Sequence, residues 1–500
     1  MNKIVNYRTD RNQEYHTKGS NTIRRSRFAH LFKKDGVVCV FHSLTRRMLF
    51  GGQSLADLYE ALEAPNTINR TIVGLSHRYS RKQLTDLIAE LQERLLLIQS
   101  QDEDAQAYIR HFNRGLAQYN IHHMYLLPTS DCNFRCMYCF LEDDERPLEP
   151  CYMSQETVES VIRIFGKLAK GNGPASVTIY GGEPLLNAGV TFSALRLLRQ
   201  LQSDGEFPQG LDISMLSNGS LIDDEAIRVL KETHAGIGIS IDGPRHLHDA
   251  ARKDIIGAGT FDSALKGFRL LQKAGLNPSV SCTLNAFTIH FMDEIVDFII
   301  NDLQPNGMGF NLLLPRVGGT GPCTAMDYDF ASHEIIRAFE RLRRAGIYED
   351  RMMRRVRPYA ENRFQCKDCM GVGGQIVVGP SGQIGPCQAL LGMNDKKYFP
   401  LHVRDLATHG EALSSETIYS DSLFDEWRHR FPMNMNDCVD CYAISVCGGG
   451  CPYASEITKG SIWEIDDRVC FQAKNILEWM IWDTYKNMTE NKSVATTFTS

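Results

Sequence analysis

Between residues 121 and 350, strand-like apolar segments alternate with segments whose apolar residues have helical spacing. Strands are predicted at residues 124–128, 177–180, 211–216, 236–241, 278–284 and 308–314, and helices at 154–168, 261–274 and 291–300. This alternation is typical of parallel strands joined by crossover helices. We therefore expect an α/β fold whose core is a sheet of about six parallel strands.

Polar or glycine-rich motifs follow several of these strands directly. The carboxyl ends of parallel strands meet at one edge of the sheet, where α/β barrels carry their active sites. The motifs are a cysteine loop after residue 128, Gly181-Gly182-Glu183-Pro184, Ser217-Asn218-Gly219 and Asp242-Gly243-Pro244. The sequence therefore predicts one site at this edge.

The first motif holds three cysteines, Cys132, Cys136 and Cys139, with the spacing C-x3-C-x2-C. Clustered thiolates select zinc or iron–sulfur clusters. A structural zinc site needs four ligands, so three thiolates favour a cubane cluster with one open iron, where a small molecule can bind. A partial zinc site and a chance grouping of buried cysteines are the alternatives.

The sequence has 15 cysteines, most of them in two groups. The polar amino terminus lacks the apolar core of a signal peptide, so we expect a cytoplasmic protein. Thiols stay reduced there, and grouped cysteines then indicate metal binding, not disulfides. We expect the isolated Cys39, Cys151, Cys282 and Cys323 to pack as small apolar side chains.

The composition is that of an ordinary globular chain of two to four domains, with 500 residues, 43% hydrophobic and 23% charged. No apolar run is long enough to span a membrane. A net charge of −6 gives no reason to expect nucleic acid. We therefore expect neither nucleic acid nor a membrane as a partner. The basic residues Arg24, Arg25 and Arg27 form either a solvated face or a partner-binding arm.

The cysteine spacing, with Tyr138 before the last cysteine, and the Gly-Gly-Glu-Pro turn resemble the radical S-adenosylmethionine (SAM) enzymes. The resemblance implies a partial (β/α)6 barrel, with a 4Fe–4S cluster on the three cysteines and SAM on its open iron. It also implies the residues that contact SAM or lie near the substrate, which are Tyr138, Gly181, Gly182, Glu183, Ser217, Asn218, Ser240 and Asp242.

In related maturases the Ser-x-Asp-Gly-Pro motif is followed by His-Asp and Arg, which match His248, Asp249 and Arg252. We name Asp242 as the candidate catalytic base, while Asp249 and tyrosine side chains remain open as alternatives. An Asx turn at Asp242 with a surface charge at Arg252 is the purely structural interpretation.

The cysteines after residue 365 match the seven-cysteine SPASM extension of this family, and Cys366 adds an eighth thiol. Eight thiolates suffice for two further 4Fe–4S clusters, whereas a pair of zinc ribbons is the alternative. By resemblance, one cluster takes Cys366, Cys369, Cys387 and Cys451, and the other takes Cys438, Cys441, Cys447 and Cys470. Cys366 is the least certain ligand, because this position varies in the family. Gly448, Gly449 and Gly450 let the chain turn tightly between Cys447 and Cys451.

The amino-terminal region contains predicted strands at residues 36–41 and 47–50 and helices at 54–62 and 80–97, with Ser54 and Ser80 as caps. This pattern resembles a winged-helix peptide-recognition domain, which adds a peptide as an extra strand. A purely structural cap is the alternative.

Five regions are therefore predicted. They are a flexible arm (1–30), a peptide-recognition-like domain (31–115), the radical SAM partial barrel (121–350), a SPASM domain (351–485) and a disordered tail (486–500).

These features predict a radical SAM/SPASM maturase that forms a 5′-deoxyadenosyl radical and oxidatively modifies, by cross-linking, a side chain of a ribosomally made precursor peptide. A flavodoxin or ferredoxin is the expected reductant. The alternatives are a sulfatase-type maturase that oxidises Cys or Ser to formylglycine, and a non-catalytic iron–sulfur protein. Gln388 argues against the sulfatase type, which carries an aspartate base after the cysteine that matches Cys387.

Overall fold

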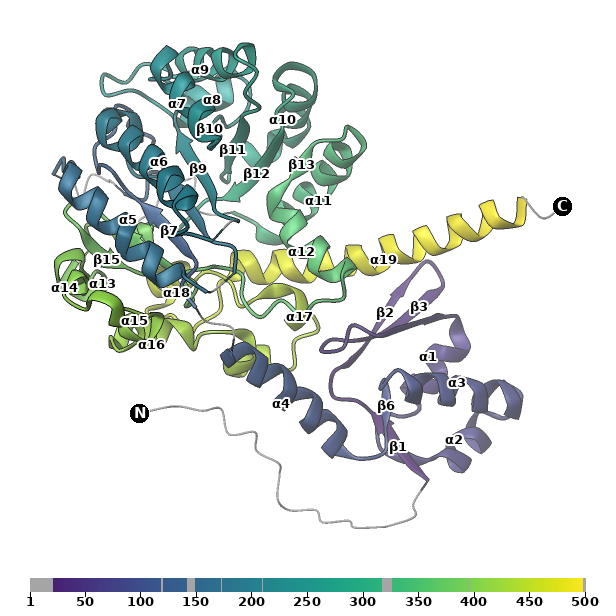
Figure 1. Cartoon of the computed structure of the whole chain (residues 1–500). Helices are drawn as coiled ribbons and strands as arrows, with labels where there is room; N and C mark the ends of the chain where they lie inside the picture. Colours follow the sequence, from purple (N-terminus) through teal and green to yellow (C-terminus); the bar gives the residue numbers. More distant parts are fainter. Residues whose placement is uncertain are drawn as a thin grey trace.

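The computed structural model describes residues 21–117, 120–141, 149–171, 173–208, 210–316, 326–393 and 395–497. Its largest part is a ten-stranded sheet with the order β13-β12-β11-β10-β9-β8-β7-β14-β15-β16. Figure 1 shows this curved sheet with helices along its outer face, and a smaller amino-terminal lobe beside the carboxyl-terminal segments. Cys323, predicted to be a packed thiol, lies outside the described residues.

The six predicted strands are present and pair in parallel in chain order. They are β7 (His123–Leu126), β8 (Ser176–Ile179), β9 (Asp212–Ser217), β10 (Gly236–Ser240), β11 (Ser279–Leu284) and β12 (Gly307–Leu312). A short strand that the sequence did not reveal, β13 (Tyr348–Glu349), extends the parallel part. The α/β class and the six-strand core are therefore confirmed.

Helices on the outer face connect these strands (Figure 1). They are α5 (Gln155–Ala169), α6 (Ala188–Ser203), α7 (Asp224–Thr233), α8 (Arg245–Ala251), α9 (Phe261–Lys273), α10 (Met292–Asp297), α11 (Tyr328–Arg344) and α12 (Asp350–Ala360). Ser154 caps α5 as predicted, since its side chain accepts a hydrogen bond from the Thr157 amide. The helix predicted at 291–300 begins as 3-10 turn η2 (Thr288–Phe291) and ends as π-helix η3 (Phe298–Leu303).

Successive side chains of a strand point to opposite faces of the sheet. In the parallel strands, the side chains on the two faces differ in size and polarity. Side chains toward the helices are apolar and buried, such as Val177, Ile213 and Met308. Side chains on the other face are smaller or polar, and neighbouring ones bond across strands, as Asn311 does when it donates to Ser281 Oγ over 3.0 Å. This polar inner face leads to the strand ends that carry the predicted motifs.

The carboxyl-terminal region continues the same sheet. Strand β14 (Gln375–Val378) pairs in parallel with β7, and β15 (Gln383–Gly385) and β16 (Leu401–His402) follow antiparallel. The remaining elements there are short helices and turns, which include η4 (Gln388–Leu390), α13 (Asp395–Tyr398), α14 (Val403–Ala407), η5 (Gly410–Ala412), α15 (Ser415–Tyr419), α16 (Ser422–Arg428), η6 (Pro432–Asn434), η7 (Asn436–Cys438), α17 (Ile444–Cys447) and α18 (Pro452–Lys459).

The amino-terminal lobe has its own apolar core of leucines and isoleucines. An antiparallel sheet of β2 (Ala29–Lys34), β3 (Val37–His42) and β4 (Met48–Gly51) packs against α1 (Gln53–Glu60), α2 (Ile68–Leu75) and α3 (Arg81–Glu93), and α4 (Gln101–Ala117) leads to the barrel. Ser80 caps α3 as predicted. Ser54 does not cap α1, because the helix begins one residue earlier, after Gly52.

The predicted flexible arm is too long. Residues 1–20 lie outside the described part, but β1 (Thr22–Arg25) pairs with β5 (Asn66–Thr67) and β6 (Leu97–Ile98). Ile23 is fully buried, and Arg25 Nε donates to the Tyr59 carbonyl over 2.7 Å. The prediction was wrong for residues 21–30 because one buried isoleucine anchors a segment that composition alone marks as solvated.

The predicted disordered tail is also wrong for most of its length. Helix α19 (Asp467–Thr497) continues past residue 486, and residues 498–500 lie outside the described part. No glycine or proline interrupts residues 467–497, and Lys486 and Glu490 form an ion pair one turn apart, at 3.9 Å. A polar composition therefore did not distinguish an exposed helix from a disordered segment.

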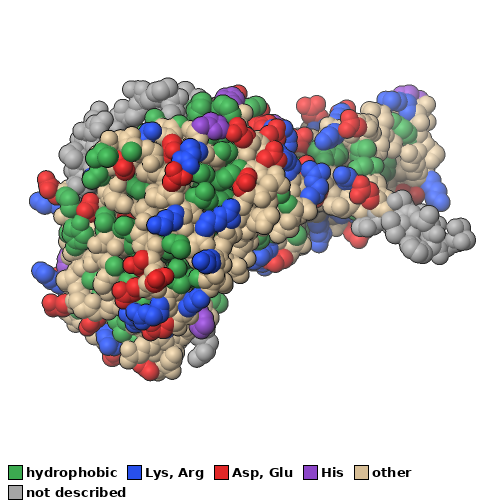
Figure 2. Space-filling model, turned by 90° about the horizontal axis from the view of Figure 1, so that it is seen from above, with side chains coloured by type: hydrophobic (Ala, Val, Ile, Leu, Met, Phe, Trp, Pro, Cys, Tyr) green, Lys and Arg blue, Asp and Glu red, His purple; other side chains and the backbone are tan. Residues whose placement is uncertain are grey.

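The surface in Figure 2 carries acidic and basic side chains interspersed across the face in view. Within the described ranges, no helix combines the length and the apolar character that crossing a membrane requires.

Candidate functional site

The cysteine loop after β7 and the Gly-Gly turn after β8 bind each other through their backbones. The Gly182 amide donates to the Thr129 carbonyl over 3.1 Å, and the Glu183 amide donates to the Asp131 carbonyl over 2.8 Å. The two motifs, about fifty residues apart in sequence, therefore form one unit at the carboxyl edge of the sheet.

Both glycines are required by this close approach. A Cβ atom on Gly181 would lie 2.5 Å from the Thr129 carbonyl oxygen, and one on Gly182 would lie 2.0 Å from that of Asp131. Gly181 also has a φ of +136°, which other residues rarely adopt. The two glycines therefore allow the turn to pack against the cysteine loop. This structural role is separate from the contact to SAM that the resemblance implies.

Glu183 connects the turn to the next strand end. Its carboxyl group is fully buried, and it accepts hydrogen bonds from Ser217 Oγ at 2.9 Å and from the Asn218 amide at 2.7 Å. Burial raises the pKa of Glu183 to about 7. The Asn218 side chain donates to Asn133 Oδ1 over 2.8 Å and lies 3.9 Å from Cys132 Sγ. The structure therefore brings these predicted SAM-binding residues together behind the cysteine loop.

The three cysteines of the loop are free thiols. Burial is the main cause that raises the pKa of Cys132 to about 12, and the charges of Glu183, Cys136 and Cys139 contribute to the increase. Burial likewise raises the pKa of Cys136 to about 11. The Met137 amide donates to the Ala251 carbonyl over 2.9 Å, which ties the loop to the end of α8.

Asp242, at the end of β10, forms a buried ion pair with Arg252. Arg252 Nε and Nη2 donate to its two oxygens over 2.8 and 3.1 Å. The Tyr138 hydroxyl donates to Oδ2, and the Thr283 amide donates to Oδ1 over 2.9 Å. The Arg252 guanidinium in turn lies 4.0 Å from Cys136 Sγ. This pair therefore fixes the middle of the cysteine loop.

These contacts favour an anchoring role for Asp242 over the predicted role as a base. Burial alone would raise its pKa, but Arg252 holds the pKa of this carboxyl below its usual range. Its oxygens accept four hydrogen bonds, so the carboxylate is ionised and its acceptor sites are occupied. A base that takes a proton from a substrate needs a free acceptor site and a higher pKa.

The other candidates at this strand end serve local structure. Asp249 Oδ1 accepts a hydrogen bond from the Phe261 amide at 2.8 Å, at the start of α9. His248 Nε2 lies 3.1 Å from Thr260 Oγ1, and burial lowers the pKa of His248 to about 4. Ser240 lies at the end of β10 beside Ser281. Asn133 and Thr283 support the loop without a sequence motif that marks them.

The later cysteines form two groups. Burial raises the pKa of Cys387, and the thiols of Cys451 and Cys369 raise it further. Burial raises the pKa of Cys438 to about 12, and Cys441 and Cys470 add to this shift. Cys447 belongs with the second group, because it lines the same cavity as Cys438, Cys441 and Cys470. The crossed ligand assignment that the resemblance implies stays a prediction.

The second group surrounds a cavity. Its volume is about 300 Å³, and all four thiols of the group are in its lining, namely Cys438, Cys441, Cys447 and Cys470. Four soft thiols around one cavity are the ligand set of a 4Fe–4S cluster. The donors present therefore fit this cofactor.

Cys366 is the fourth predicted member of the first group. It is buried, and burial raises the pKa of its thiol, which the charges of Lys367 and Arg114 lower. Its role as a cluster ligand stays a prediction.

Three consecutive glycines separate the two groups. Gly448, Gly449 and Gly450 have φ values of +72°, +89° and +75°. A Cβ atom on Gly448 would lie 2.2 Å from the Asp368 amide nitrogen. The predicted tight turn between Cys447 and Cys451 is thus present, and these two thiols diverge to different groups.

In the described part of the chain, no three Cys, His, Asp or Glu side chains converge on a position for a single metal ion. A cubane places each thiolate on a different iron, so its ligands stand further apart than the four around one zinc ion.

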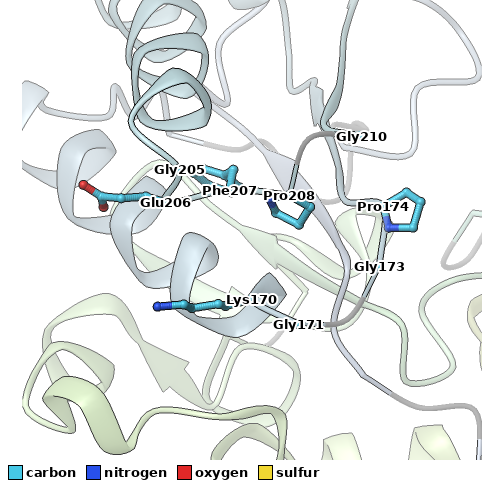
Figure 3. A pocket seen from close by; sticks show the side chains of 9 residues that line it. All are labelled: Lys170, Gly171, Gly173, Pro174, Gly205, Glu206, Phe207, Pro208 and Gly210. Carbon is cyan, nitrogen blue, oxygen red and sulfur yellow. The ribbon is translucent and has the colours of Figure 1, made fainter.

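A further cavity of about 440 Å³ lies at the opposite ends of the strands, in the loops before β8 and β9 (Figure 3). Glycines, prolines, Phe207, Lys170 and Glu206 line it. Because α/β barrels place stabilising contacts at this end and chemistry at the other, we assign the site to the cysteine loop.

Comparisons with known proteins identify the family. A sequence model described as the radical SAM superfamily matches residues 126–300, which contain the cysteine loop and the strand ends described above. The chain belongs to the radical SAM superfamily. It is therefore a radical SAM enzyme, and membership implies a 4Fe–4S cluster and SAM as cofactors.

Two relatives are a radical SAM cyclopropyl synthase and an anaerobic sulfatase-maturating enzyme. The radical SAM cyclopropyl synthase TigE of Paramaledivibacter caminithermalis is 22% identical over 497 residues, which cover 92% of this chain and 96% of TigE. A cysteine-type anaerobic sulfatase-maturating enzyme of Clostridium perfringens is 31% identical over 175 residues, which cover 34% of this chain and 46% of that enzyme.

Two solved structures share the fold. The structure of anSMEcpe with bound AdoMet has a TM-score of 0.61 at 20% identity, covering 74% of this chain and 100% of that one. SuiB of Streptococcus suis bound to the precursor peptide SuiA has a TM-score of 0.52 at 16% identity, covering 90% of this chain and 99% of that one. The mixed α/β fold with its parallel sheet is thus similar to the folds of anSMEcpe and SuiB.

Proposed function

We propose that this chain is a radical SAM/SPASM maturase that cross-links a side chain of a ribosomally made precursor peptide by oxidation. Residues 121–350 form the radical SAM barrel, residues 351–485 the SPASM domain with two auxiliary clusters, and residues 31–115 a peptide-recognition domain. In this family, the first cluster and SAM supply a 5′-deoxyadenosyl radical that abstracts hydrogen from an unactivated carbon.

The residues of the chain hold this chemistry in place. Cys132, Cys136 and Cys139 are the ligands of the first cluster, and Arg252 with Asp242 fixes their loop. Gly181, Gly182, Glu183, Ser217, Asn218 and Ser240, with Tyr138, surround the place for SAM. Their positions at adjacent strand ends support this assignment.

The observation that carries the proposal is the cavity lined by Cys438, Cys441, Cys447 and Cys470. A set of four soft donors separate from the three of the cysteine loop gives a substrate radical an electron acceptor, which a net oxidation requires. Cys369, Cys387 and Cys451 form the other auxiliary site, with Cys366 as the predicted fourth ligand. Counting the first site, the proposal assigns three 4Fe–4S clusters to the chain.

The amino-terminal lobe contacts the region of the second auxiliary site. His30 and Phe32 of β2 pack against Tyr442, next to Cys441, with ring centroids 6.1 and 5.5 Å apart. Strands β2 and β4 are the edges of their sheet, where a peptide can add as a strand. SuiB, solved with its precursor peptide, supports a peptide substrate. A flavodoxin or ferredoxin is proposed as the reductant.

A sulfatase-type maturase is the second candidate, favoured by the 31% identity to the clostridial enzyme. We rank it lower because of Gln388, which follows Cys387. The sulfatase type carries its aspartate base at this position, whereas the glutamine side chain cannot ionise.

The test is anaerobic incubation of the reconstituted enzyme with SAM, a reductant and the peptide encoded beside its gene. Mass spectrometry should show a product that lacks two hydrogen atoms, with the change at one cross-link. Cys441→Ala should abolish this product while most 5′-deoxyadenosine formation persists. A peptide that stays unchanged while a sulfatase Cys or Ser becomes formylglycine would favour the second candidate.

A further inference from the structure

Arg430 is a cationic side chain that sequence motifs do not mark, and it lies between the two later cysteine groups. It precedes η6 and is fully buried. Its guanidinium donates to the carbonyls of Gly449 and Gly450. Both glycines line the cavity of the second group, and Gly450 directly precedes Cys451 of the first group. Arg430 thus lies beside both predicted auxiliary sites.

The hydrogen bonds of Arg430 all go to neutral acceptors. Its Nη1 donates to the carbonyls of Gly449 and Gly450 over 2.7 and 3.3 Å, and its Nε donates to the carbonyl of Ile462. Its Nη2 donates to Ser455 Oγ and to the Glu464 carbonyl, both over 3.1 Å. The two glycines belong to the turn between Cys447 and Cys451, so Arg430 also clamps the link between the groups.

The carboxylate of Asp466, whose charge acts on Arg430, is already engaged by another arginine. Asp466 accepts hydrogen bonds from Arg468 Nη2 at 2.9 Å and from Arg468 Nε at 3.1 Å. A fully buried cation without an anionic hydrogen-bond partner costs several kcal/mol unless an opposite charge lies close by. Thiolate-ligated iron–sulfur clusters are anionic, and both predicted sites adjoin this guanidinium.

We propose that Arg430 is a positioning residue that serves as the shared counter-ion of the two auxiliary clusters. This inference rests on the proposed function, because it requires both clusters. A nearby positive charge favours the more negative, reduced form of a cluster and so raises its reduction potential. Arg430 therefore raises both potentials together and keeps both clusters able to accept electrons.

The experiment is a redox titration of the reconstituted full-length enzyme followed by electron paramagnetic resonance, with iron and sulfide counted in each sample. Arg430→Gln should lower the potentials of both auxiliary clusters and leave that of the SAM-binding cluster unchanged. Arg430→Lys should retain most of the wild-type potentials, because it keeps the charge. Arg199→Gln is the matched control, since Arg199 also donates to backbone carbonyls, including those of Leu211 and His234, each over 3.1 Å.

Several results would overturn the inference. Unchanged auxiliary potentials in a fully loaded Arg430→Gln enzyme would do so, as would a shift of one cluster alone or an equal shift in Arg430→Lys. If Arg430→Gln does not load, loading of Arg430→Lys supports the counter-ion, and failure of both shows a purely geometric clamp. A wild-type enzyme that binds iron for one cluster only contradicts the proposed function itself, whatever Arg430 does.

Discussion

The ion pair between Asp242 and Arg252 makes the sharpest prediction about the cysteine loop. Their side chains are 1% and 8% exposed, and Asp242 also accepts bonds from Tyr138 and Thr283. Asp242→Asn leaves the Arg252 cation buried without its partner. Breaking such a pair costs about 3–5 kcal/mol, which corresponds to roughly a hundredfold to several-thousandfold more frequent local opening.

Hydrogen exchange measured by mass spectrometry tests this magnitude. The amides of Arg135 and Met137 are bonded to the carbonyls of Lys253 and Ala251, so peptides that cover these segments report opening of the loop. Exchange there should accelerate strongly in Asp242→Asn, while peptides from β8 and β9 should change little.

An exposed pair near α8 provides the control. Arg245 and Asp262 form an ion pair whose side chains are 57% and 75% exposed. Asp262→Asn should change exchange little, because water screens an exposed ion pair. Equal exchange in the Asp242 and Asp262 variants would refute the anchoring argument, as would an Asp242→Asn enzyme that loses only substrate turnover, which is the behaviour of a lost base.

Three further predictions concern other parts of the chain. Gly182→Ala should reduce iron binding and SAM cleavage severely, because its Cβ would lie 2.0 Å from a carbonyl oxygen of the cysteine loop, whereas Gly189→Ala, with no atom within 4 Å, should be tolerated. Cys369→Ala and Cys366→Ala should each lose iron from the first auxiliary site, because both are proposed ligands of its cluster; full iron binding in Cys366→Ala would show that Cys366 is not a ligand. Burial, followed by neighbouring histidines, lowers the pKa of His42 to about 3, so the stability it contributes is complete above pH 6.5 and falls as the pH decreases toward 3. His42→Gln should make the thermal unfolding temperature depend less on pH across that range. An unchanged pH dependence would contradict this role of His42.

The sequence predicted the parallel core well because its strands are short apolar runs that end in motifs. The period-two pattern places Val177 and Ile213 against helices, and the glycines of the Gly-Gly turn mark a close backbone approach. The assignment of the later cysteines to two clusters rests on spacing that a known family shares and stays a prediction. These features are local or repeated, so they are readable without tertiary contacts.

The errors arose where a long-range contact decides the structure. Ile23 orders a polar segment because it enters a core built by residues far along the chain. The contact between Asp242 and the Thr283 amide is another such case, because no spacing rule connects these two residues. Arg430 belongs to no motif, and only the fold brings it to both cysteine groups.

The central claim is that Cys132, Cys136 and Cys139 generate the radical while the later cysteines hold auxiliary clusters. The most direct measurement combines an iron count with 5′-deoxyadenosine formation from SAM under anaerobic reduction. The account predicts about twelve irons per chain for three four-iron clusters. Replacing the three cysteines by alanine should lower this to about eight irons and abolish 5′-deoxyadenosine. Radical formation that survives this replacement, or a wild-type enzyme that forms no 5′-deoxyadenosine, would contradict it.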